Sequence, residues 1–290
     1  MRDQAEKLRM KMLENQGSLG RSIAVVSGKG GVGKSNFTTN FAILLSNLGK
    51  KVVVLDMDIG MGNINILIGK NARYNLKDYL VGEVPLQDVI LDGPNNLKYI
   101  SGGSGLSSVV QWSPTMFESL ISAFETLQKN FDYILFDMGA GATNWSLDLL
   151  TSIDEIIVIS TTEPTSITDA YSMMKYIHLR DQTKKFYLVV NRAFTTEEGR
   201  ETGFRLKNTM MKFLSKEINL LGSLPEDPLV RKAVIDQIPF SISYPDSSIS
   251  KTLQAMVSSF VNYRVEEVYA PNQPNSFLKK LKNIFSKGRG

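Results

Sequence analysis

Eight consecutive residues have the pattern of a phosphate-binding loop, G-x-x-x-x-G-K-[ST]. They are Gly28, Lys29, Gly30, Gly31, Val32, Gly33, Lys34 and Ser35. An apolar run precedes them and a helical pattern follows, which is the context that the motif requires. Glycines let backbone N–H groups approach phosphate oxygens, and the start of the helix adds partial positive charge. We therefore expect Lys34 to contact the β- and γ-phosphates, Ser35 to bind Mg²⁺, and the adjoining Asn36 to line the nucleotide site.

Three aspartates follow apolar runs that are typical of buried strands. Asp56 and Asp58 close the run that begins at Val52, and Asp137 closes the run that begins at Tyr133. Because strand side chains alternate, both Asp56 and Asp58 are expected on one face, at the carboxyl edge. A carboxylate in the position of Asp137 holds Mg²⁺ through water in P-loop enzymes. For Asp56 and Asp58, strand-end capping or a turn is the alternative.

The elements that must position these residues alternate between strands and helices. The predicted strands are Ile23–Ser27, Val52–Asp56, Tyr133–Asp137, Ile156–Ser160, Phe186–Asn191 and Ile218–Leu221. Amphipathic helical stretches separate them, so we predict an α/β fold with a single doubly wound, mostly parallel sheet and helices on both faces. Ligands of such sheets bind at the carboxyl ends of the strands, where the loop and the aspartates fall.

Composition limits the number of domains and the chemistry. The chain has 290 residues, 42% of them hydrophobic, which suits one large domain. It has no cysteine, so disulfides, thiol catalysis and cysteine-bound iron–sulfur clusters are excluded. We expect an N-terminal segment at 1–20, a nucleotide-binding domain at 21–265, a linker at 266–276 and a tail at 277–290. The net charge is +4, and the tail alone carries +5, so the remaining chain is about −1 (4 minus 5).

The phosphate loop resembles the deviant Walker A loop of the MinD/ParA family of ATPases, because it begins Lys29-Gly30-Gly31. The resemblance implies a slow ATPase that uses ATP and Mg²⁺ and forms a homodimer when ATP is bound. In that family the first lysine, here Lys29, reaches the partner's nucleotide and supplies positive charge in trans. The resemblance also implies that Asp58 orients the attacking water and that Asp56 supports the Mg²⁺ shell.

Two further segments match this family. Asp137, Gly139 and Gly141 lie in a sequence that resembles its D-x-x-A-G switch loop, in which glycines permit movement when the γ-phosphate leaves. The family places an asparagine and a second loop around the adenine, which implies a base pocket of Asn191, Arg192, Pro225, Glu226 and Asp227. The alternatives are a glycine-rich loop, a strand-end turn at Asn191, and a helix cap at Asp227 before Pro228.

The first residues resemble the D-Q-A-x-x-L-R motif of the FlhG (YlxH) group of flagellar-number regulators within this family. The matching residues are Asp3, Gln4, Ala5, Leu8 and Arg9. In that group the segment binds FlhF, a GTPase related to those of the signal-recognition particle, and stimulates its hydrolysis. The resemblance implies that Gln4 acts near the partner's nucleotide. The alternative is an ordinary solvated helix.

The tail has an apolar stripe bordered by lysines. On a helix its apolar residues fall within an arc of roughly 120°. These are Phe277, Leu278, Leu281, Ile284 and Phe285, and the lysines at the margins are Lys279, Lys280 and Lys282. This is the form of an interfacial membrane helix, and two copies on one dimer would bind far better than one. The alternative is a terminal helix that packs its stripe on the body, and the two states could alternate with the bound nucleotide.

The resemblance implies an ATPase that sets flagellar number or placement. It would be cytoplasmic, bind reversibly to the cytoplasmic face of the cell membrane, and contact an FlhF-type GTPase and flagellar switch-complex proteins. The first alternative is a MinD-type ATPase that places the division site. The second is a ParA-like DNA-segregation protein, but the near-neutral body predicts no specific nucleic-acid partner. A third alternative is a binding module in which ATP acts as a conformational clamp with little turnover.

Overall fold

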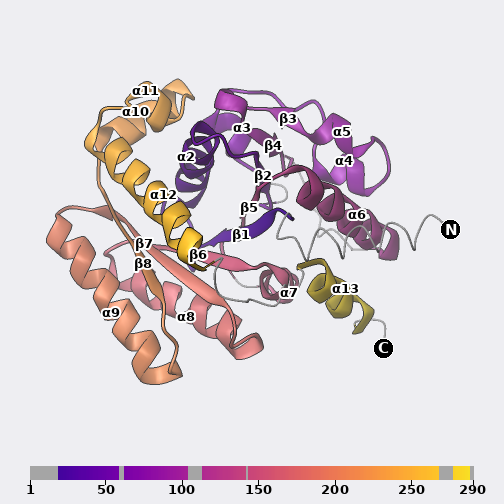
Figure 1. Cartoon of the computed structure of the whole chain (residues 1–290). Helices are drawn as coiled ribbons and strands as arrows, with labels where there is room; N and C mark the ends of the chain where they lie inside the picture. The colour runs from indigo at the N-terminus through magenta and orange to yellow at the C-terminus, as the bar shows by residue number, and fades with distance from the viewer. Residues whose placement is uncertain (1–18, 59–61, 104–112, 142, 268–276, 288–290) are drawn as a thin grey trace.

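The computed structural model describes residues 19–58, 62–103, 113–141, 143–267 and 277–287, which form a layered α/β structure (Figure 1). Its sheet has the strand order β3-β4-β2-β5-β1-β6-β7-β8. Neighbouring strands are parallel except for β3 and β4. The predicted doubly wound, mostly parallel fold is confirmed. The strands are β1 Arg21–Val26, β2 Val52–Asp56, β3 Leu91–Asp92, β4 Lys98–Ile100, β5 Tyr133–Asp137, β6 Glu155–Ser160, β7 Lys185–Ala193 and β8 Asn219–Pro225.

Near-continuous apolar residues form the central strands because both faces of the sheet are covered. Every residue of β2, β5 and β6 is buried. All six predicted strands are present, with ends that shift by a few residues. The structure adds β3 and β4 at one edge, and these were not predicted because two or three residues are too few to show a pattern.

Helices cover the sheet in two layers, each with its own apolar core. One layer consists of α4 Leu76–Leu80, α5 Leu86–Val89, α6 Pro114–Asn130, α7 Asn144–Ser152, α8 Pro164–Arg180, α9 Thr196–Leu214 and α13 Phe277–Lys287. The other consists of α2 Lys34–Asn47, α3 Ile64–Leu67, α10 Pro228–Asp236, α11 Phe240–Ser243 and α12 Ser248–Glu267, and a short 3₁₀ helix, η1, spans Pro94–Asn96. None of the described helices is both long and apolar enough to cross a bilayer.

The last helix, α13, is part of the first layer although a long stretch of sequence separates it from its neighbours. It packs against α6 and α7 (Figure 1). The ring of Phe277 lies 5.3 Å from that of Phe124 on α6 and 5.9 Å from that of Phe136 on β5. The helix therefore covers part of the sheet itself. The predicted linker at 266–276 overlaps the end of α12 at Glu267, and residues 268–276 lie outside the described part of the chain.

Candidate nucleotide site

The phosphate loop connects β1 to α2 and requires glycine at several positions. Gly31 and Gly33 have φ values of +79° and +88°, which side chains rarely permit. A Cβ at Gly28 would lie 2.3 Å from the backbone of Asp169 on α8. The loop is therefore held close to α8 with its backbone exposed to a ligand rather than covered by side chains.

The first turn of α2 has backbone N–H groups without a side-chain cap, because its N-cap residue is Gly33. Uncapped N–H groups at a helix start are suited to phosphate oxygens. Lys34 begins this helix, and its Nζ lies 2.9 Å from Oδ1 of Asp137. The same oxygen accepts a hydrogen bond from Thr38 at 3.2 Å. The loop lysine is thus paired with the carboxylate at the end of β5.

Asp56 and Asp137 lie side by side, because they occupy paired positions on the parallel strands β2 and β5. Asp56 is 1% exposed and accepts hydrogen bonds from the backbone N–H groups of Asp58, Asn63 and Ile64. Burial, and then the charge of Asp137, raise the pKa of Asp56 to about 6. Two adjacent carboxylates, one of them paired with Lys34 of the loop, fit Mg²⁺, which needs additional oxygens. No three acidic or histidine side chains of the described residues converge on one point. Oxygens of a bound nucleotide's phosphates would add to the shell.

Asp58 lies beside the predicted switch loop. A Cβ added to Gly139 would come within 3.4 Å of Oδ1 of Asp58, so the two segments touch. Gly141 has a φ of +90°, which glycine permits. Thr143 then caps α7 by accepting a hydrogen bond from the backbone N–H of Ser146. The switch loop therefore leads directly into α7.

Lys29 has contacts that the sequence did not indicate. Its Nζ donates a hydrogen bond to Oε2 of Glu163 at 2.9 Å and another to Oγ1 of Thr165 at 3.3 Å. Its bond and charge lower the pKa of the Glu163 carboxyl. The Lys29 side chain is still 43% exposed at the open edge of the loop. Glu163 follows the predicted strand that ends at Ser160, and this position at the carboxyl edge was the available signal.

The predicted base-pocket residues lie at the carboxyl ends of the paired strands β7 and β8 and just after β8. Nδ2 of Asn191 donates to the carbonyl of Val32 at 2.8 Å, so Asn191 braces the phosphate loop. Arg192 has a φ of +59° and pairs with Glu226 at 2.7 Å. Asp227 is the N-cap of α10 and accepts from the N–H of Leu229, which is the role given above as the alternative. Pro225 ends β8 beside them.

The two ends of the chain differ in what the structure places. The motif residues Asp3, Gln4, Ala5, Leu8 and Arg9 lie outside the described residues. In the tail, Phe277, Leu278 and Leu281 are buried against the body, which corresponds to the docked alternative. Lys279 and Lys282 are exposed, and Lys280 and Lys282 bond to carboxylates of the body. Residues Ile284 and Phe285 belong to α13, but their side chains lie outside the described part.

Comparison with known proteins agrees with this geometry. Residues 18–261 match the family model described as ParA, NUBPL iron-transfer P-loop NTPase. The chain is 33% identical over 257 residues to the antiactivator FleN of Pseudomonas aeruginosa, covering 89% of this chain and 90% of FleN. It is 31% identical to the flagellum site-determining protein YlxH of Helicobacter pylori, covering 86% of this chain and 84% of YlxH.

A solved structure has the same fold. The cell division ATPase MinD of Pyrococcus furiosus superimposes with a TM-score of 0.70 at 25% identity, covering 84% of this chain and all of that one. The phosphate loop, the paired Asp56 and Asp137, and Lys29 at the open edge are thus found on a MinD-like sheet. The chain belongs to the MinD/ParA-type family of P-loop NTPases, as do its relatives FleN and YlxH.

Proposed function

We propose that this protein is an ATP-dependent regulator of flagellar number or placement. The observation that carries the proposal is its similarity to FleN and YlxH over 89% and 86% of the chain. ATP with Mg²⁺ would bind at the loop Gly28–Ser35, and hydrolysis would be slow. The metal would supply charge compensation for the phosphates, while Lys34 binds them and Asp58 orients water.

We further propose that hydrolysis requires a homodimer. Lys29 supports this proposal, because it lies at the open edge of the loop and bonds to an exposed carboxylate rather than to its own phosphate site. An ATP-bound partner facing this edge would offer phosphate oxygens in place of Glu163. Lys29 would then supply positive charge in trans, only when two subunits meet.

We also propose that the dimer binds the cytoplasmic face of the membrane through two copies of α13. The lysine-flanked stripe of this helix supports the proposal. The described apolar residues of the stripe are buried against the body, so membrane binding requires that α13 leave its site.

The N-terminal motif would stimulate an FlhF-type GTPase, and this can be tested directly. GTP turnover by a purified FlhF-type GTPase is measured with the full chain and with its Gln4→Ala variant. We expect stimulation by the wild type that Gln4→Ala abolishes, because a glutamine amide can orient the attacking water. Absence of stimulation by the wild type would refute the flagellar assignment and leave the ATPase in place.

A division-site role is the second candidate, supported by the likeness to MinD of Pyrococcus furiosus. The same experiment distinguishes the two, since only the flagellar role predicts an FlhF-type partner. DNA segregation is not favoured, because the basic charge is concentrated in residues 277–290. Iron transfer through cysteine ligands is not proposed for a chain without cysteine.

A further inference from the structure

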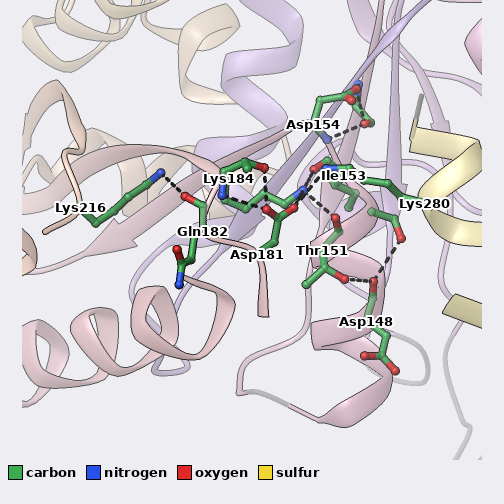
Figure 2. Close-up of polar contacts among 12 residues, drawn as sticks. Asp148, Thr151, Ile153, Asp154, Asp181, Gln182, Lys184, Lys216 and Lys280 are labelled. Atoms are coloured by element: carbon green, nitrogen blue, oxygen red, sulfur yellow. Dashed lines mark hydrogen bonds and ion pairs between the residues drawn. The ribbon is translucent and has the colours of Figure 1, made fainter. Parts of the chain in front are cut away.

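Two lysines of α13 are bonded to carboxylates on two different helices of the body. Nζ of Lys280 lies 3.1 Å from Oδ2 of Asp181, the residue that directly follows α8. Lys282 donates a hydrogen bond to Glu125 on α6. Figure 2 shows Lys280 and Asp181 within a larger group of polar residues. These are two of the lysines that an anionic lipid surface would attract.

We propose that Asp181 and Glu125 form a tail clamp: they hold α13 on the body through its lipid-binding lysines, so that anionic lipid headgroups compete with these two carboxylates for Lys280 and Lys282. This inference rests on the proposed membrane function and adds the residues that regulate it. The clamp makes release depend on the charge of the membrane and not on its apolar interior alone.

Asp181 can lose Lys280 without becoming an unpaired charge. It also accepts hydrogen bonds from the backbone N–H and the hydroxyl of Thr183, and it pairs with Lys184 at 3.6 Å. Burial opposes its ionisation, but the hydrogen bonds from Thr183, the charge of Lys184 and the bond to Lys280 together outweigh burial and lower the pKa of Asp181 to about 2. The contributions of Thr183 and Lys184 remain when Lys280 leaves. Release of the tail therefore avoids the large penalty of an orphaned buried carboxylate.

The clamp is joined to the helix that follows the switch loop. The ammonium of Lys184 is almost fully buried and donates hydrogen bonds to the carbonyls of Thr151 and Ile153 at the end of α7 (Figure 2). The helix α13 itself also packs on α7. Because the switch loop leads into α7, a movement of α7 would change both the surface on which α13 packs and the position of Asp181.

The charge of the membrane can decide whether α13 stays on the body or binds lipid, because the apolar residues of α13 are buried in both places. Phe277, Leu278 and Leu281 are buried on the body and would be buried again in lipid. Release of α13 exposes the residues that it covers, including Phe124 and Phe136. The cost of exposing them favours the docked state. Lipid binding by two tails of one dimer and the loss of the clamp act in the opposite direction.

The first test measures docking without any membrane. Amide hydrogen exchange in α13 is compared between the wild type and the double variant Asp181→Asn/Glu125→Gln. We expect exchange in α13 to rise by about fivefold, because two partly exposed ion pairs are lost. The matched control is Asp236→Asn/Asp246→Asn, which changes the net charge equally on the opposite layer. Unchanged exchange in the clamp variant would overturn the proposal.

The second test uses the full chain with vesicles of phosphatidylcholine, with or without phosphatidylglycerol. Without nucleotide, the clamp variant should bind the anionic vesicles about fivefold better than the control variant, because more of its tails are free. Both variants should bind neutral vesicles less well than anionic ones, because their lysines then meet no anionic headgroups. Equal binding by the clamp and control variants would refute competition by lipid. Faster exchange in α13 without vesicle binding by any variant, even with ATP, would uphold the clamp on the body and refute the proposed membrane function.

Discussion

Two lysines of one short loop have opposite environments. Lys34 is 8% exposed and bonded to the buried Asp137, whereas Lys29 is 43% exposed on its side chain and bonded to the exposed Glu163. The first is fixed where the phosphates of its own subunit would lie. The second is held only by groups that water or a partner can replace. This difference in burial is what the proposed roles require, with Lys34 binding in cis and Lys29 acting in trans.

Lys29→Ala should abolish hydrolysis while leaving ATP binding intact. A cation supplied in trans contributes about a thousandfold or more to phosphoryl transfer, and its loss should lower kcat by that order. Binding should persist, because Lys34 and the uncapped start of α2 are unchanged. Steady-state ATPase assays and titration with a fluorescent ATP analogue measure the two effects.

Lys34→Ala serves as the contrasting variant. It removes the cation of the binding site, and it leaves Asp137 buried without its charged partner. We expect loss of both ATP binding and hydrolysis. If Lys29→Ala instead hydrolysed ATP at the wild-type rate, the role of Lys29 in trans would be wrong.

At the scale of elements, hydrophobic periodicity predicted the strands that are long enough to show a pattern. The strand Val52–Asp56 was predicted with its observed bounds. Its residues are apolar up to the final aspartate, as expected for a strand in a sheet that is covered on both faces. The strands β3 and β4 were missed, since Gly93 and Pro94 interrupt a very short run. Asp56 and Asp137 were both expected at the carboxyl edge of the sheet, and they occupy paired positions there on β2 and β5.

Other parts of the site depend on contacts that periodicity does not contain. The apolar stripe of α13 is the same whether it faces lipid or Phe124 and Phe136, so the sequence left both alternatives open. The bond between Lys29 and Glu163 joins residues 134 positions apart. Such a pair follows from the strand order of the sheet, which the sequence pattern did not specify.

The buried Lys184 predicts a pH dependence of stability at the junction of α7, α8 and α13. Burial, and then the charge of Lys280, lower its pKa from 10.5 to about 8, while Asp181 opposes this shift. The charged form is thus disfavoured in the folded state. Its cost is fully present below pH about 8, and it is relieved as the pH rises towards the unfolded pKa of about 10.5.

Lys184→Met removes this titration. Relative to the variant, the wild type should gain about 2–3 kcal/mol in unfolding free energy between pH about 7 and pH about 10. Urea unfolding of both proteins at several pH values measures the difference. The exposed Lys251 on α12 is the control position for the same substitution. A difference between wild type and Lys184→Met that does not vary with pH would show that Lys184 stays unperturbed.

At the scale of the whole molecule, the nucleotide site and the tail occupy separate regions joined by α7. The site lies at the carboxyl edge of the sheet, and α13 lies in one helical layer between α6 and α7 (Figure 1). A dimer that formed across the nucleotide edge would leave this layer uncovered on both subunits. The proposed dimerisation and the proposed membrane binding are therefore compatible, with two tails per particle.

Asp58→Ala should hold the protein on membranes when ATP is present. This variant keeps the loop, Lys29 and the paired Asp56 and Asp137, so ATP binding and dimerisation should persist while hydrolysis falls. A second tail raises vesicle binding by about a hundredfold or more, because its binding is intramolecular. Sedimentation with anionic vesicles should therefore show Asp58→Ala bound and slow to leave, and Lys34→Ala unbound. If Asp58→Ala dissociated as fast as the wild type, hydrolysis would not be the step that releases the protein, and exchange of nucleotide without turnover would have to perform it.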